Sequence, residues 1–233
     1  MTNCFLRICL ALIVFGSMGA GCAWFQPPRE DKTAQELVEE GMDAFSNGHY
    51  RTAISSFEKL RDWYPFSRYA ILAELKIADA HFSLEEYADA IFAYEQFEQL
   101  HPRNEAIPYV IYQIGRSCFN QMGTPDTDPT HTTAALETYQ RLIRQYPDDP
   151  HARSAQSDMV ACYRNLSAHE FDIGVFYYKN KNYKAAKQRF LSVITQYPDV
   201  GHHHAALNYL ANCDLWLKSQ DVLPEMISAP AAP

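Results

Sequence analysis

The side chains that could do chemistry in this chain are a run of three histidines and three pairs of adjacent acids. Neutral imidazoles could bind a transition metal, and paired carboxylates could act as general acid and base. The histidines follow Gly201 at a predicted helix start, however, and the acids are typical of solvated faces and first helical turns. No phosphate-binding glycine-rich loop, zinc-protease histidine pair or nucleophile elbow occurs, so we expect no enzyme, metal site or cofactor. The residues concerned are 202–204, Glu39-Glu40, Glu85-Glu86 and Asp148-Asp149.

Covalent chemistry is expected instead at Cys22, as the attachment point of a lipid. Residues 1–21 have the form of a secretory signal, with Arg7, an apolar run over residues 8–15 and small residues up to the cysteine. The apolar run is short for a membrane span. Residues 19–22 resemble a bacterial lipobox, whose cysteine carries a diacylglycerol and an N-acyl chain, although Gly19 stands where leucine is usual. Ordinary signal cleavage, with Cys22 a free thiol, is the alternative.

Residues 22–32 would form a tether between this lipid and the folded body. In lipoproteins an Asp after the cysteine often retains the protein at the inner membrane, and here Ala23 follows it. The resemblance therefore implies the periplasmic face of the outer membrane. The ten residues from Ala23 to Lys32 span roughly 33–36 Å when extended, and Pro27-Pro28 stiffens them. The body should stay close to its membrane.

A row of aromatic side chains suggests a groove for a peptide. Three phenylalanines recur at intervals of 37 residues, and four further side chains are expected on the same helix face as the second or third of them, since offsets of 3 and 4 share a face. Such a groove suits an extended or hairpin peptide with an apolar or aromatic end. The alternative is that the rings only pack neighbouring hairpins. The predicted groove residues are Phe45, Asp79, Phe82, Tyr109, Tyr112, Arg116 and Phe119.

These residues are positioned by a short pattern that recurs four times. Each intact copy has a small residue, an alanine, two large apolar residues and a proline at successive offsets of 12, 4, 3 and 5. This is the spacing of a tetratricopeptide helical hairpin, in which small residues let two helices approach and proline ends the second. The first copy is Gly41, Ala53, Phe57, Leu60 and Pro65. The predicted fold is an all-α tetratricopeptide solenoid with about four full repeats and a C-terminal capping helix.

The repeat domain is expected over residues 33–219. Eight extra residues in the third repeat place an insertion within residues 122–131, and the lack of a breaker between Ala152 and Ile173 predicts one long helix from about Pro150 to Tyr178. The predicted hairpins cover about residues 33–65, 66–102, 103–147 and 150–198, followed by the capping helix at 202–219 and a flexible tail at 220–233.

Composition excludes one class of partner. Loss of Arg7 with the leader changes the formal net charge from −8 to −9, and no basic patch with aromatic interleaving occurs. Nucleic acid is therefore an unfavourable partner. Cys118, Cys162 and Cys213 remain, an odd number for an oxidising compartment. We expect buried small hydrophobes, with a disulfide or a reactive thiol as the alternative.

Four segments carry a family resemblance beyond the generic repeats: residues 64–70, 97–102, 126–130, and 177–179 with 183–186. With the lipobox and the long helix, they resemble the BamD (ComL) family of outer-membrane assembly lipoproteins. The resemblance covers about residues 22–219. The chain departs from the family in Gly19 and in a C-terminus too short for a complete fifth hairpin.

The resemblance implies a non-enzymatic subunit of the machinery that folds β-barrels into the outer membrane. The first repeats would receive targeting segments of unfolded barrel proteins, and the last would dock the POTRA domains of the barrel subunit, in a complex with accessory lipoproteins. Arg189 matches a position that the family uses in this docking, and Lys184 and Lys187 belong to the same basic cluster. A solvated helix face is the alternative for that cluster. Alternative functions are a lipidated pilotin for a secretin or pilus subunit, and a cell-wall enzyme regulator or weak hydrolase.

Overall fold

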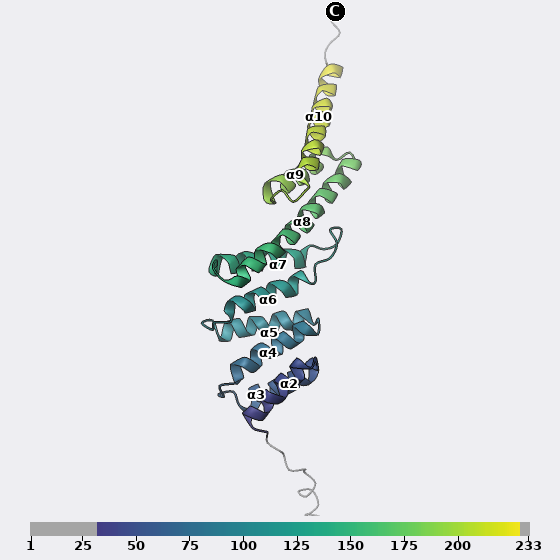
Figure 1. The fold of residues 1–233 in the computed structure, drawn as a ribbon. Helices are drawn as coiled ribbons and strands as arrows, with labels where there is room; N and C mark the ends of the chain where they lie inside the picture. Colours follow the sequence, from purple (N-terminus) through teal and green to yellow (C-terminus); the bar gives the residue numbers. More distant parts are fainter. Residues whose placement is uncertain (1–31, 229–233) are drawn as a thin grey trace, which may run out of the picture.

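The structure is a computed structural model that describes residues 32–228, with side chains as far as Ser219. Cys22, the predicted signal and the tether up to residue 31 lie outside the described residues. Every regular element in the described range is an α-helix (Figure 1). The helices are α2 (Ala34–Ser46), α3 (Tyr50–Trp63), α4 (Ala70–Ser83), α5 (Tyr87–Leu100), α6 (Ile107–Phe119), α7 (Thr130–Gln145), α8 (Pro150–Lys179), α9 (Tyr183–Gln196) and α10 (His203–Ser228).

The helices form a stack of antiparallel hairpins. Each helix packs mainly on its neighbours in sequence, and α6 also contacts α8. Figure 1 shows the stack rising from α2 to α10 as an elongated solenoid. An architecture in which each repeat touches mainly the next is that of a repeat protein, and the predicted all-α tetratricopeptide solenoid is confirmed.

Local signals set the helix ends. At the start of α2, the Thr33 hydroxyl accepts from the Glu36 amide at 3.2 Å, and the Glu36 carboxylate accepts from the Thr33 amide at 2.7 Å. This capping box satisfies amides that have no partner within the helix, and the backbone hydrogen bond lowers the pKa of Glu36. Helices α3, α5 and α7 each end two residues before a proline, namely Pro65, Pro102 and Pro147.

Within a hairpin, an aromatic ring of the second helix lies directly on the backbone of the first. A Cβ atom built on Gly174 would lie 2.7 Å from Cε1 of Phe190, closer than real side chains approach. The Phe190 ring is completely buried. The first and third hairpins repeat the arrangement with Gly41 on Phe57 and Gly115 on Tyr139. The second hairpin has Ala78 and Tyr94 at the spacing of Gly41 and Phe57.

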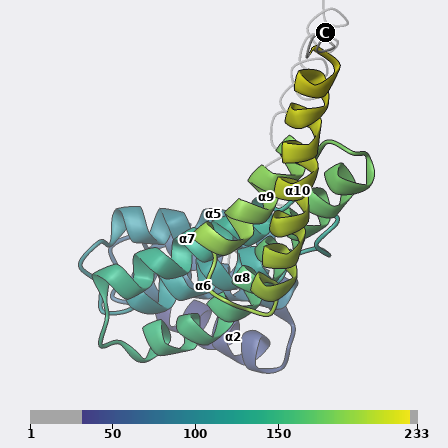
Figure 2. The same ribbon diagram turned by 90° about the horizontal axis from the view of Figure 1, so that it is seen from above.

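Helix α8 takes part in two hydrophobic cores. Its first half contributes Ala152, Cys162 and Leu166 to the central core shared by α4 to α7. Its second half packs Phe171 and Val175 against the core of α9 and α10. The long helix expected from the lack of a breaker is therefore present, and it joins the two parts of the solenoid. Figure 2 shows that α10, which follows α8 and α9, extends away from the stacked hairpins.

Helix α10 is longer than predicted. It ends at Ser228, nine residues beyond the expected boundary at 219, so most of the predicted flexible tail is helical. The stretch from His203 to Leu223 holds no glycine or proline, so nothing in it required an end at 219, and the helix continues past Pro224 to Ser228. Among the described residues, no helix is long and apolar enough to cross a membrane.

The contact between Gly174 and Phe190 predicts that Gly174→Ala destabilises the protein. The added methyl group overpacks a buried ring, which costs about 1–3 kcal/mol, more than the roughly 0.5–1 kcal/mol that alanine gains over glycine in a helix. Thermal unfolding followed by circular dichroism measures the loss. The same substitution in a Phe190→Leu background should cost clearly less, because the smaller side chain leaves room. Equal costs in the two backgrounds would contradict this contact.

Candidate functional site

Phe45 and Phe82, two of the predicted groove residues, each hold a cation from the next hairpin over the ring. The Lys76 ammonium lies 4.9 Å from the centre of the Phe45 ring, and the Arg116 guanidinium lies 5.0 Å from the centre of the Phe82 ring. Both rings are half-buried. A ring face attracts a cation electrostatically. We call these four residues the aromatic–cation row.

The same phenylalanines also close their hairpins. Each ring packs edge-on against the tyrosine that begins the following helix, and the last hairpin repeats this contact with two tyrosines. Packing is thus part of what these rings do, as the alternative interpretation proposed. Phe119 is instead followed by the insertion, and it packs half-buried against the central core. The three pairs are Phe45–Tyr50 at 5.3 Å, Phe82–Tyr87 at 5.7 Å and Tyr178–Tyr183 at 5.4 Å between ring centres.

Tyr112 extends the row toward α8. Its ring stacks on His151, with centres 5.4 Å apart and planes 29° apart, and its hydroxyl donates to Asp158 at 3.2 Å. The Arg116 guanidinium lies 5.9 Å from the Tyr112 ring, so it touches two of the predicted groove aromatics. Burial and the charge of Asp158 raise the pKa of Tyr112. The structure therefore brings Phe82, Tyr112 and Arg116 together, whereas helix periodicity placed Tyr112 and Arg116 on one face with Phe119.

Asp79 does not line this surface, and the prediction that it does is corrected. Its side chain is 6% exposed. One carboxylate oxygen accepts from the hydroxyls of Tyr94 at 2.7 Å and Tyr109 at 2.8 Å, and the other accepts from Lys76 at 2.8 Å. Burial, with the nearby Asp79 charge, raises the pKa of both tyrosines. Asp79 ties α4 to α5 and α6, and the hydroxyl of Tyr109 points inward with it.

The predicted docking cations lie on α9, and two of them already pair within the chain. Arg189 donates two hydrogen bonds from one nitrogen to the two oxygens of Glu170, at 3.0 and 3.1 Å. Lys187 pairs with Asp214 at 2.5 Å, whereas the Lys184 side chain is exposed to solvent. The side chain of Arg189 is 41% exposed, so it is held in place while one side remains open.

Beside Arg189 the surface is hollowed, and sequence reasoning missed this hollow. The insertion after α6 forms one wall because α8 holds it: Asn165 donates to the Gly123 carbonyl at 2.9 Å, and His169 lies 2.6 Å from the Pro125 carbonyl. The Phe176 ring is 61% exposed in the hollow. The aromatic run at residues 176–178 was the available signal. The lining residues are Pro125, Asp126, His169, Asp172, Ile173, Phe176, Tyr177 and Arg189.

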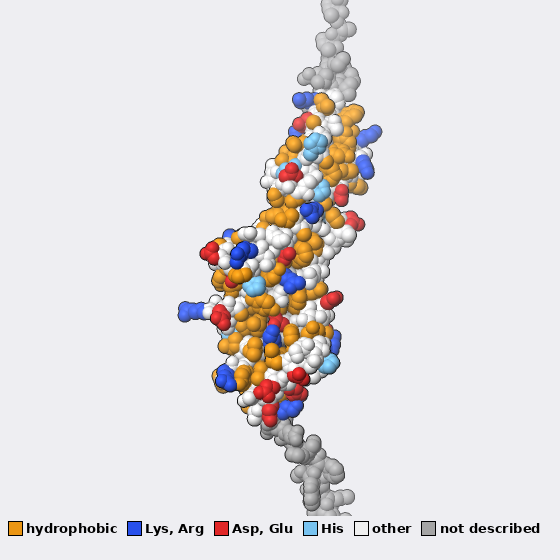
Figure 3. All heavy atoms as spheres, in the orientation of Figure 1, with side chains coloured by type: hydrophobic (Ala, Val, Ile, Leu, Met, Phe, Trp, Pro, Cys, Tyr) orange, Lys and Arg blue, Asp and Glu red, His pale blue; other side chains and the backbone are white. Residues whose placement is uncertain are grey.

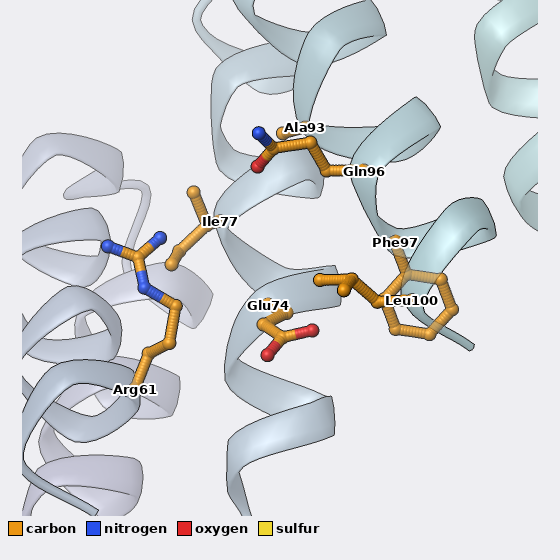
Figure 4. Close-up of a pocket in the computed structure, with 7 residues that line it drawn as sticks. All are labelled: Arg61, Glu74, Ile77, Ala93, Gln96, Phe97 and Leu100. Carbon is orange, nitrogen blue, oxygen red and sulfur yellow. The ribbon is translucent and has the colours of Figure 1, made fainter. Parts of the chain in front are cut away.

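A smaller pocket lies between α3, α4 and α5 (Figure 4). Figure 4 shows Arg61 on one side and Leu100 on the other, with Glu74 between them. Glu74 pairs with His101 at 2.6 Å, which links α4 to the end of α5. No sequence pattern singles out these residues, since they come from three helices.

Other reactive groups are engaged or buried. Of the described residues, His81, Glu86 and Asp89 lie close enough together to share a metal ion, but Glu86 already pairs with Arg51 at 2.6 Å and with His81 at 2.9 Å. The three cysteines of the repeat domain are free and buried, as predicted for small hydrophobes. Burial raises the pKa of each thiol, that of Cys162 to about 12, which keeps them protonated and unreactive at neutral pH.

Comparison with known proteins identifies the family of this chain. The profile of a family described as outer membrane lipoprotein, YfiO, matches residues 30–224. The chain belongs to this family. Proteins named outer membrane protein assembly factor BamD are similar to it. That of Neisseria gonorrhoeae is 26% identical over 78% of this chain and 72% of its own length, and that of Vibrio cholerae is 27% identical over 77% and 78%.

Another protein of that name, from Rickettsia prowazekii, is 26% identical over 92% of this chain and 86% of its own length. Among solved structures, the MamA protein aligns with a TM-score of 0.41 at 14% identity, over 86% of this chain and 98% of its own. A tetratricopeptide protein of Thermus thermophilus, TTC0263, aligns with a TM-score of 0.42 at 14% identity, over 77% and 100%. The family resemblance is thus confirmed, and relatives named as assembly factors agree with the expectation of a non-enzymatic protein.

The carboxylate of Asp79 predicts a large loss of stability in Asp79→Ala. The substitution leaves Lys76 and two hydroxyls without their acceptor, and breaking a buried pair in this way costs about 3–5 kcal/mol. Urea unfolding measures the change. Tyr109→Phe removes one of the three donors and should cost only about 1 kcal/mol. Asp89→Ala, at an exposed position on α5, serves as the control. An Asp79→Ala variant as stable as this control would overturn the assignment of Asp79 to the interior.

Proposed function

We propose that this protein is a non-enzymatic subunit of the machinery that assembles β-barrel proteins in the outer membrane. The observation that carries the proposal is the family match over residues 30–224, together with relatives named outer membrane protein assembly factor BamD. Acyl chains on Cys22 would hold the protein at the periplasmic face of the membrane. Accessory lipoproteins of the same complex are further expected partners.

The first three hairpins would receive segments of unfolded barrel proteins at the aromatic–cation row. Arg116 supports this role because its guanidinium is held between the rings of Phe82 and Tyr112. A peptide that ends in an aromatic residue could place its ring on these half-buried aromatics and its carboxylate on the cation. Because packing already orients the cation, little side-chain entropy is lost on binding.

The last hairpin would dock a POTRA domain of the barrel subunit. Arg189 supports this role because it is half-exposed and oriented by Glu170. An acidic side chain of the partner could share or replace Glu170 as its acceptor, and arginine can bind a carboxylate in a bidentate manner. The exposed Phe176 ring in the adjacent hollow offers an apolar anchor for the same partner.

Arg116→Ala tests the peptide site. It should weaken binding of a C-terminal barrel-protein peptide about tenfold or more, since a hydrogen bond to a charged group contributes about 1.5–3 kcal/mol. A fluorescence-anisotropy titration measures the affinity. Arg116→Lys should lose less because it keeps the charge, and Arg144→Ala, at an exposed position on α7, should bind like the parent. Unchanged affinity in a folded Arg116→Ala protein would rule out this site.

Arg189→Ala tests the docking site. It should reduce capture by purified POTRA domains by about tenfold, and the parent interaction should weaken with salt. Alanine is preferred to glutamate because a new carboxylate would stand beside Glu170 and repel it. Arg144→Ala is the matched control, as an exposed arginine on α7 outside the predicted docking cluster. Peptide binding should be unchanged in both variants, because the two sites lie on different hairpins. Equal capture of parent and Arg189→Ala would exclude this contact.

A further inference from the structure

The turn between α3 and α4 exposes apolar side chains at its tip. Phe66 is 100% exposed, the highest value among the large apolar side chains of the described residues, and Trp63 is 48% exposed. The turn itself is well defined: the Ser67 amide donates to the Tyr64 carbonyl at 3.0 Å, and Pro65 occupies the position where proline presets a turn. A rigid turn therefore holds the Phe66 ring in solvent.

Folding does not require a phenylalanine at this place, because the next two hairpins form the same turn without it. The Asn104 amide donates to the His101 carbonyl at 2.9 Å, and the Asp149 amide donates to the Tyr146 carbonyl at 3.2 Å. Polarity at the matched positions rises along the solenoid. The residue after the proline is Phe66, then Arg103, then Asp148, and the residue that ends the preceding helix is Trp63, then Leu100, then Gln145.

The apolar turn is also the one nearest to the start of the described chain. The Tyr64 hydroxyl donates to the carbonyl of Lys32 at 2.9 Å. Cys22 lies ten residues before Lys32, and ten residues span at most roughly 33–36 Å. Figure 1 shows the chain entering the stack at the end formed by α2 and α3. A lipid on Cys22 would thus keep this turn within a short distance of the membrane.

We propose that Trp63 and Phe66 form a second membrane contact, which inserts into the headgroup region beside the lipid anchor. The inference rests on the proposed anchor at Cys22. Aromatic side chains prefer this interfacial layer. Acids gather where the described chain begins, as Figure 3 shows. The two arginines that flank the turn are already engaged, Arg61 with Asp62 and Arg68 with the Tyr69 ring. The contact is therefore mainly apolar and should resist salt. Two contacts, unlike a tether alone, fix the orientation of the solenoid on the membrane.

The test uses the full lipidated chain on vesicles of equal parts phosphatidylethanolamine and phosphatidylglycerol. Phe66→Cys, Arg103→Cys and Asp148→Cys are each labelled with the same polarity-sensitive dye, while the native cysteines of the repeats are buried. We expect the dye at position 66 to increase several-fold in emission and to be quenched by spin-labelled lipids. The dye at position 148, on the same kind of turn, should remain in water.

A second variant removes the aromatic ring without a dye. Phe66→Asp introduces the residue type that the third hairpin carries at this position, so the variant should have the melting temperature of the parent. In a Trp24→Phe, Trp216→Phe background, Trp63 is the remaining tryptophan. Phe66→Asp should reduce the quenching of Trp63 fluorescence by spin-labelled lipids. Parent-like quenching in Phe66→Asp would overturn the inference. The inference would also be overturned if the protein floats with the vesicles while the dye at position 66 stays in water or responds like the dye at position 148. The proposed lipid anchor at Cys22 would not be contradicted by that result. Failure to float would overturn both proposals.

Discussion

The structure depends on the close approach of two helices within each hairpin, where an aromatic ring lies on a glycine in three hairpins and opposite Ala78 in the second. The ring of Phe190 occupies the space in which a Cβ of Gly174 would stand, and the first and third hairpins repeat this contact. Because interiors are close-packed, the contact sets the distance and angle of each pair of helices. Similar hairpins then stack in similar ways, which brings Phe45 and Phe82 to matched places under cations of the next hairpin.

Local chemistry explains why much of the fold could be predicted. The capping box at Thr33, the prolines after the second helices and the unbroken stretch within α8 act over a few residues, and the sequence displays them directly. The place of Asp79 could not be derived in this way, because two of its three donors come from helices that follow it in the chain. The same holds for Glu170 beside Arg189 and for the hollow, which exists only because the insertion folds back on α8.

Three of the cations at the proposed binding surfaces are engaged within the protein. Lys76 touches Phe45 and Asp79, Arg116 touches Phe82, and Arg189 touches Glu170. A partner would therefore exchange one contact for another rather than capture a free charge. Such exchange lowers the net gain in affinity, but it keeps each cation in one position and limits binding by unrelated anions.

Helix α8 joins the central core to the core of α9 and α10 through thirty residues of unbroken helix. A helix of this length spans about 45 Å. Each residue also advances the helix by about 100° in rotation. The number of residues in α8 therefore sets both the distance between the two halves of the solenoid and the rotation of one half relative to the other. A single inserted residue would hardly lengthen the molecule, yet it would swing the face that carries Arg189 through more than a quarter of a turn. Insertions and deletions in this family should accordingly be tolerated in the loops but not within α8.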